Sequence, residues 1–157
     1  MKIISIALSV LIIIIISGIA YNTLWHNGTI TLRHHEEQHY HVVTVTAHDL
    51  PASFFGTAFH LHYNSQELTF HHYTLGTYFS TKNPITLVNN KAATIIAGLS
   101  LKRGEAITKK EGDLLHLYFE KGRHYQKNPF VNFSNTVFST FTDKREDLPV
   151  SFSPHTT

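Results

Sequence analysis

The chain has 157 residues, which is enough for one domain with a short additional segment. Thirteen Lys and Arg residues stand against eleven Asp and Glu, and the two signs are interleaved, so no strongly basic surface for nucleic acid is expected. The absence of cysteine excludes disulfides, thiolate zinc sites and a cysteine nucleophile. With 42% hydrophobic and 15% charged residues, the chain can form a buried core.

The first residues have the pattern of an export signal. Lys2 precedes an apolar run over residues 3–16, and small residues follow up to Ala20. This pattern predicts either a signal peptide cleaved after Ala20 or an uncleaved anchor, since residues 3–21 are long enough to cross about 30 Å of hydrocarbon. Residues 1–21 are therefore predicted to be a signal peptide or transmembrane helix. Because Lys2 is the only early basic side chain, the rest is expected to be extracytoplasmic, secreted or membrane-anchored.

The remainder divides into a polar segment, a β domain and a tail. Residues 22–39 are polar and weakly patterned, which predicts a stalk or an irregular lead-in. From residue 40 apolar and polar residues alternate, as in strands with one buried face. The domain is predicted over residues 40–153 and a tail over 154–157. The clearest strands are predicted at 41–47, 59–63, 68–70, 93–99, 115–119, 137–141 and 150–152.

Turn-forming residues separate these runs. Asn64–Ser65 and Asn89–Asn90 are examples, and residues 102–110 are predicted to be a loop or a short helix. About nine strands at short spacing, without a convincing helix, favour an all-β sandwich.

Several segments follow a distinctive pattern of strands and turns. In residues 54–70 a strand ends at Tyr63, a turn follows at Asn64–Ser65, and Leu68 begins the next strand, which resembles the early signature of the cohesin family. Gly76 and Phe79 resemble its glycine and apolar residue before a variable loop. Residues 111–119 resemble its later glycine turn and buried strand, and the similarity extends over roughly residues 40–153.

The resemblance implies a jelly-roll sandwich that docks a dockerin module of another protein at the cell surface. If the chain belongs with the related carbohydrate-binding sandwiches, it implies polysaccharide binding and a link to polysaccharide degradation. Carried onto this chain, the partner-binding positions are the outward residues of the strand before the tyrosine turn, namely Ala58, His60 and His62. These are expected to form a flat polar patch, with Tyr63 turned inward.

Histidine is unusually frequent, with 13 residues. His34, His35, His39 and His41 supply nitrogen ligands suited to zinc, copper or nickel. No His-Glu-x-x-His motif occurs, so we expect a polar segment exposed to solvent rather than a specific metal site. A metal-linked or adhesive surface protein remains a third alternative.

No catalytic motif is recognisable. The Gly-x-Ser-x-Gly motif, phosphate loops and dinucleotide fingerprints are all missing, so we expect a non-catalytic binding module without a cofactor. The single tryptophan, Trp25, lies next to the apolar segment. Tyr73 and Tyr118 are candidates for outward positions, but no row of three aromatic residues is apparent, which favours a protein partner over polysaccharide.

Overall fold

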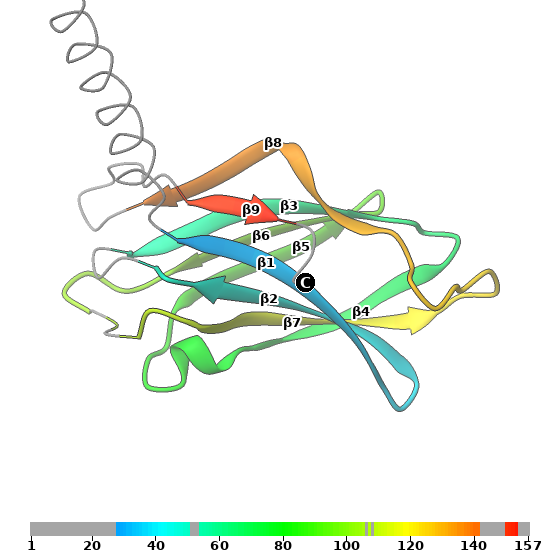
Figure 1. The fold of residues 1–157 in the computed structure, drawn as a ribbon, viewed down its shortest axis with the longest axis horizontal. Helices are drawn as coiled ribbons and strands as arrows, with labels where there is room; N and C mark the ends of the chain where they lie inside the picture. Colours follow the sequence, from blue (N-terminus) through cyan, green and yellow to red (C-terminus); the bar gives the residue numbers. More distant parts are fainter. Residues whose placement is uncertain (1–27, 51–53, 106, 108, 142–149, 154–157) are drawn as a thin grey trace, which may run out of the picture.

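The computed structural model describes residues 28–50, 54–105, 107, 109–141 and 150–153, with only the backbone described over 135–141 (Figure 1). Nine strands and one short 3-10 helix lie within these residues. They are β1 (Thr29–Glu37), β2 (Tyr40–His48), β3 (Gly56–Tyr63), β4 (Leu68–Leu75), η1 (Thr77–Phe79), β5 (Ile85–Lys91), β6 (Thr94–Ser100), β7 (Gly112–Lys121), β8 (Val131–Phe141) and β9 (Ser151–Ser153).

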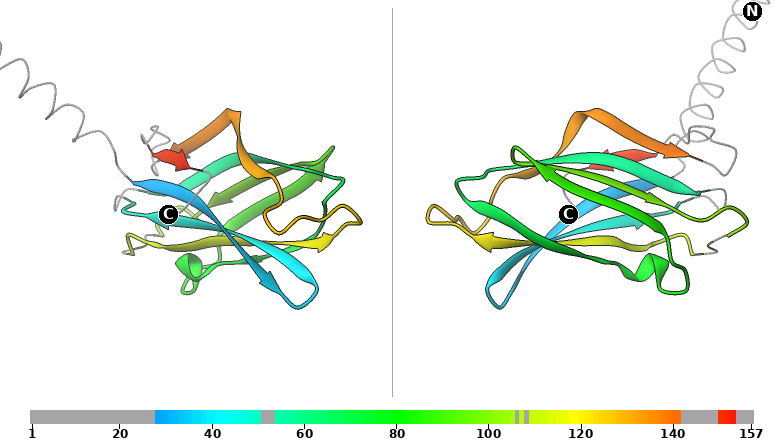
Figure 2. Two further views of the ribbon diagram at one scale, coloured as in Figure 1. Left: turned by 45° about the vertical axis from the view of Figure 1, so that its right-hand side comes forward. Right: turned by 180° about the vertical axis from the view of Figure 1, so that it is seen from behind.

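The strands form two sheets that pack face to face (Figures 1 and 2). The five-stranded sheet has the order β4-β7-β2-β1-β9, and the four-stranded sheet has the order β5-β6-β3-β8. The short β9 pairs in parallel with β1, whereas the other paired strands are antiparallel. This confirms the predicted all-β sandwich.

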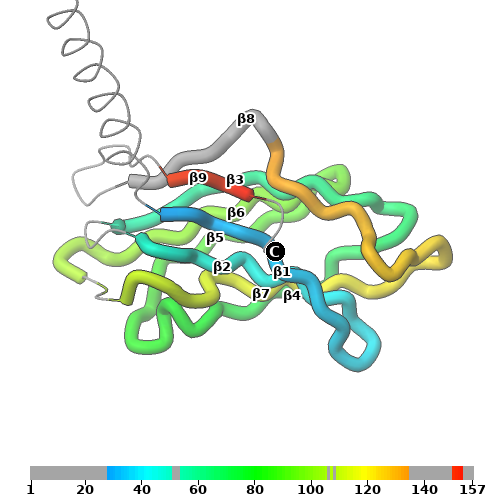
Figure 3. The backbone as a smooth tube through the Cα atoms, in the orientation of Figure 1, coloured from blue at the N-terminus to red at the C-terminus, as the bar shows by residue number. Residues whose placement is uncertain are grey.

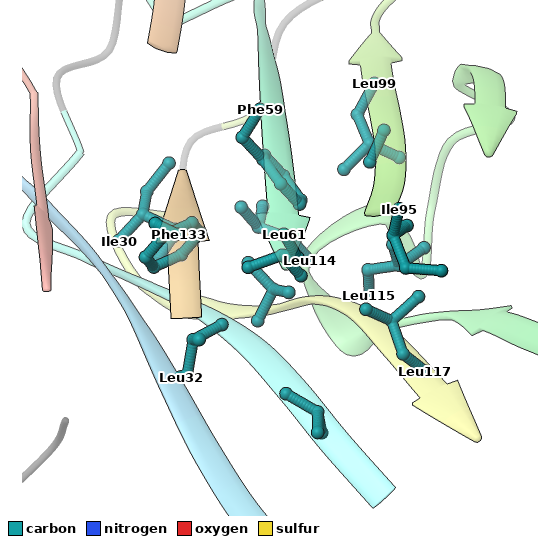
Figure 4. Close-up of a cluster of buried hydrophobic side chains, with 14 of the residues drawn as sticks. Ile30, Leu32, Phe59, Leu61, Ile95, Leu99, Leu114, Leu115, Leu117 and Phe133 are labelled. Atoms are coloured by element: carbon teal, nitrogen blue, oxygen red, sulfur yellow. The ribbon is translucent and has the colours of Figure 1, made fainter. Parts of the chain in front are cut away.

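The core lies between the two sheets. Figure 4 shows Phe59 and Leu61 of β3 together with Leu115 and Leu117 of β7 in one cluster of fully buried hydrophobic side chains. The alternation predicted for the strands at 41–47, 59–63 and 115–119 is confirmed, since their apolar residues all belong to this core: Val43, Val45, Ala47, Phe59, Leu61, Tyr63, Leu115, Leu117 and Phe119. Burying a large aliphatic or aromatic side chain contributes roughly 1.5–3 kcal/mol, so this layer dominates the stability of the fold.

The sandwich begins earlier in the chain than predicted. Strand β1 covers residues 29–37, which the sequence pattern assigned to a stalk or irregular lead-in. It pairs with β2 along its whole length, from Thr29 opposite His48 to Glu37 opposite Tyr40. Only Ile30 and Leu32 supply fully buried apolar side chains, so the alternation was too short to stand out from the polar residues that follow.

Strand β5 was also missed. It runs through Asn89–Asn90, where a turn was predicted, and the chain instead reverses at Ala92 and Ala93. Both alanines have positive φ values, 50° and 59°, a conformation that favours glycine or asparagine, so the sequence carries no turn signal here. As an edge strand, β5 is paired on one side only, with β6.

Two further segments complete the fold. Residues 102–110 form a loop wherever the structure describes them. At the end of β4, Gly76 lies so close to β7 that an added Cβ would overlap the carbonyl oxygen of Asp113. This glycine is therefore required by the approach of two backbones.

The predicted export segment, residues 1–21, and Trp25 lie outside the described residues. Among the residues that are described, none belongs to a helix of the length and hydrophobicity needed to cross a membrane.

Candidate functional site

The three partner-binding candidates lie on the outer surface of the four-stranded sheet. Strand β3 runs between β6 and β8 (Figure 3), and its residues alternate between the core and the outside. Phe59 and Leu61 are buried, while Ala58 and His60 are half-buried and His62 is exposed. The predicted phase of this strand is therefore confirmed, and the structure places all three candidates on one face.

Neighbouring strands hold the two imidazoles at defined positions. His62 is opposite Thr94 of β6, and its Nδ1 lies 2.8 Å from the Thr94 hydroxyl oxygen. His60 is opposite Ile96 of the same strand. The hydrogen bond at His62 restricts its ring, whereas His60 lies against an aliphatic neighbour.

Strands β5 and β6 add an apolar component that was not predicted. Ile85 and Leu87 on β5 are each 62% exposed, and Leu87 lies opposite Gly98 of β6. Gly98 in turn lies opposite Ala58 of β3, so the middle of the sheet carries almost no side-chain bulk. Exposed aliphatic residues on β5 therefore share this face of the sheet with the polar patch expected on β3, from which β6 separates them.

We call this surface the four-strand face and define it by Ala58, His60, His62, Ile85, Leu87, Ile96 and Gly98. Its two ends differ in chemistry. Ile85 lies at the end next to Ser100, whereas Lys91 lies at the other end, opposite Thr94 and thus in line with His62. The outward positions described on β3, β5 and β6 include no acidic residue. The face therefore suits an apolar partner surface with acidic or hydrogen-bonding groups at one edge.

A second polar group lies at one end of the sandwich interior and involves two of the four metal candidates. His34 Nδ1 is 3.1 Å from His41 Nε2, and His41 Nδ1 is 3.0 Å from the Tyr125 hydroxyl. Tyr125 donates to Glu36 at 2.8 Å, and Lys121 donates to the other oxygen of Glu36 at 2.7 Å. We call these five residues the inner polar chain.

The hydrogen-bond donors within the inner polar chain can be assigned. The Tyr125 hydroxyl uses its only proton on Glu36, so His41 must donate its Nδ1 proton to the tyrosine oxygen. Neutral His41 then accepts at Nε2 from the Nδ1 proton of His34. Both ring nitrogens of His41 are thus occupied by hydrogen bonds.

The surroundings of the inner polar chain shift the pKa values of three of its side chains. Burial, and secondarily the neighbouring His34, lowers the pKa of His41 to about 4. Hydrogen bonds from Lys121 and Tyr125 lower the pKa of Glu36. Burial and the hydrogen bond to Glu36 raise the pKa of Tyr125 to about 12. The inner polar chain therefore keeps the buried imidazole of His41 neutral.

The remaining metal candidates do not join this pair. His35 and His39 are exposed, and no group of three potential metal-binding residues occurs in the part of the chain that the structure describes. Residues 35–39 are exposed, as expected for a polar segment, but His41 is only 2% exposed. Its packing explains the difference, because β1 and β2 place His41 between the sheets, opposite Phe119 of β7.

Aromatic residues gather on the outer surface of the five-stranded sheet. Tyr118 stacks on His72 with a centroid distance of 4.3 Å and an interplanar angle of 8°, and Tyr40 meets both rings edge-on. A sugar ring binds best on a freely exposed aromatic face. The face that Tyr118 turns to His72 is already covered, so these rings do not make an open sugar-binding platform.

The sequence matches no known family model and no curated protein at a significant level. Solved structures, in contrast, share its fold. The sixth cohesin of scaffoldin B from Acetivibrio cellulolyticus, solved in complex with a mutant Cel5 dockerin, has a TM-score of 0.67 at 12% identity, covering 81% of this chain and 94% of that one.

Two further structures come from other organisms. A non-cellulosomal cohesin from the archaeon Archaeoglobus fulgidus has a TM-score of 0.61 at 12% identity, covering 80% of this chain and 86% of that chain. The seventh type I cohesin of ScaB from Pseudobacteroides cellulosolvens has a TM-score of 0.63 at 13% identity, with coverages of 83% and 88%. The chain therefore has a cohesin-like fold.

Proposed function

We propose that the chain is a non-catalytic cohesin-like module that docks a dockerin-type module of another protein through the four-strand face. The observation that carries this proposal is the pair of exposed aliphatic side chains, Ile85 and Leu87, on the same sheet face as the imidazoles of β3. Neighbouring exposed aliphatic side chains with polar groups on the same face are typical of a protein-binding site. The fold supports the choice of partner, because the Acetivibrio neighbour was solved with a dockerin.

Export is part of the proposal. Lys2 and the apolar residues 3–21 favour transfer of the domain across the cytoplasmic membrane, followed by secretion or retention by an N-terminal anchor. A role in polysaccharide degradation gains no support from the fold alone, since the Archaeoglobus neighbour is described as non-cellulosomal.

The test uses one variant that blocks the face without disturbing the core. At Gly98 an added Cβ would meet only the Leu87 Cβ, at 4.0 Å, which is an ordinary contact. Gly98→Arg should therefore fold and cover the centre of the face. The matched control is Thr74→Arg, which adds the same side chain at an exposed position on the five-stranded sheet.

Affinity is measured by calorimetry against the dockerin modules encoded in the same genome. We expect one of them to bind the wild type and the control alike, and Gly98→Arg to abolish that binding. Replacing His60 and His62 together by alanine should weaken it by about 1–3 kcal/mol, the range for losing interface hydrogen bonds. Equal affinities in Gly98→Arg and Thr74→Arg would exclude this face, and failure of all the dockerins to bind would contradict the proposed partner.

A further inference from the structure

Two adjacent histidines on β4 point the same way because of an irregularity in the strand. In the pairing with β7, Phe70 lies opposite Phe119 and His72 lies opposite Tyr118, which leaves His71 as an extra residue in a β-bulge. In a regular strand His71 and His72 would face opposite sides of the sheet. Here their Nδ1 atoms are 2.7 Å apart.

Packing fixes the orientation of both rings. His72 is held by stacking on Tyr118, and Tyr40 contacts His71 and His72 at centroid distances of 5.2 and 5.7 Å. The two imidazole planes are inclined at 80° to each other. A ligand pair held in this way loses little side-chain entropy when it binds an ion.

The local charge favours a cation. Glu120 on β7 places its Oε1 3.7 Å from His71 Nε2, and its side chain is mostly exposed. This carboxylate faces Nε2 of His71 and not Nδ1, so it adds negative charge near the imidazole pair without being a ligand of an ion held by the two Nδ1 atoms. Imidazole nitrogens are themselves ligands that first-row transition metals bind. In the absence of a metal, one imidazole N–H donates to the other ring nitrogen.

We propose that the Nδ1 atoms of His71 and His72 bind Cu²⁺ on the outer surface of the five-stranded sheet, with water completing the coordination. Metal–nitrogen bonds of about 2.0–2.1 Å separate two nitrogens by about 2.9 Å at a right angle and by about 3.4 Å at a tetrahedral angle. The observed 2.7 Å is nearer the first value. Tetragonal sites select copper or nickel, and copper is the more tightly bound of the two.

This site is separate from the proposed docking surface. The copper ligands lie on β4, at the edge of the five-stranded sheet, whereas the four-strand face belongs to the other sheet. Copper binding can therefore be tested without a dockerin, and its outcome does not depend on the docking proposal.

The experiment is a Cu²⁺ titration of the full chain, with citrate as a competing oxygen ligand that suppresses weak sites. Affinity is followed by calorimetry and the ligands by electron paramagnetic resonance. We expect one Cu²⁺ with a tetragonal spectrum and couplings to imidazole nitrogens. His71→Ala and His72→Ala should each lower the affinity at least tenfold, whereas His124→Ala, at an exposed histidine outside the site, should leave it unchanged.

Circular dichroism in the absence of metal checks that each variant keeps the fold. In addition, Cu²⁺ should raise the melting temperature of the wild type and of His124→Ala, but not of the His71→Ala/His72→Ala double variant. Wild-type copper affinity in the folded double variant would overturn the proposal. A loss in His124→Ala as large as that in His71→Ala would overturn it as well.

Discussion

Mild acid should destabilise the protein through His41. This residue is 2% exposed and neutral, with both nitrogens used inside the inner polar chain. The charged and titratable groups around it are His34, His35 and Glu36 on β1, Lys121 on β7 and the hydrogen-bonded Tyr125, and burial has the largest effect on its pKa. An added proton would thus have to be accommodated in the interior, next to a second imidazole.

The sign and size of the effect follow from the two pKa values. The pKa of His41 is 6.5 in the unfolded chain and about 4 in the folded protein, so the unfolded state binds the proton more readily. The contribution of neutral His41 is complete above pH 6.5 and is lost as the pH falls toward 4. Between pH 7 and pH 5 the loss is about 2 kcal/mol. The hydrogen-bonded Glu36 has a lowered pKa and affects stability only below about pH 4.5, outside this interval.

The assay is urea unfolding followed by circular dichroism at pH 7, 6 and 5, for the wild type, His41→Leu and His124→Leu. We expect the free energy of unfolding of the wild type and of His124→Leu to fall by about 2 kcal/mol more than that of His41→Leu. His124 is an exposed histidine, so it controls for the loss of an imidazole as such. If His41→Leu retained the full pH dependence of the wild type, the argument from its burial would be refuted.

Three further predictions concern the core, a close backbone contact and the topology. Phe119→Ala should destabilise the protein by about 3–5 kcal/mol in denaturant melts, whereas His116→Ala should cost only about 1 kcal/mol, the value of its hydrogen bond to Thr44. Gly76→Ala should lower the free energy of unfolding by about 1–3 kcal/mol, because its Cβ would overlap Asp113, while Gly98→Ala should be nearly neutral. A reporter fused after Thr157 should be active only if it works outside the cytoplasm, and activity of a cytoplasmic reporter would contradict the export proposal.

Strict alternation made most of the sandwich predictable. Strands β3 and β7 each place three large apolar residues at every second position, so their buried sides could be identified from the residue pattern. The same phase correctly assigned Ala58, His60 and His62 to the outer face of β3. The edge strand β5 was harder to predict, because it is paired on one side only and the chain after it turns at two alanines, without a turn motif.

Bulges and long-range contacts explain why the positions of the remaining residues could not be predicted from the sequence. A bulge in β7 turns Leu114 as well as Leu115 into the core, and the bulge in β4 brings His71 beside His72. Period-two reasoning cannot produce either arrangement, because one extra residue reverses the phase locally. The contact of His41 with Tyr125 joins residues separated by 84 positions, and no local pattern encodes it.

The two outer surfaces differ in what they would gain from a protein partner. On the five-stranded sheet, Asp113 already accepts hydrogen bonds from Arg33 and Thr46, so a partner would have to compete with contacts inside the molecule. On the four-strand face, Ile85 and Leu87 are exposed to water, and burying each would contribute up to roughly 1.5–3 kcal/mol. Docking on the four-strand face therefore gains hydrophobic free energy without breaking an existing network, which is the physical reason to place the partner there.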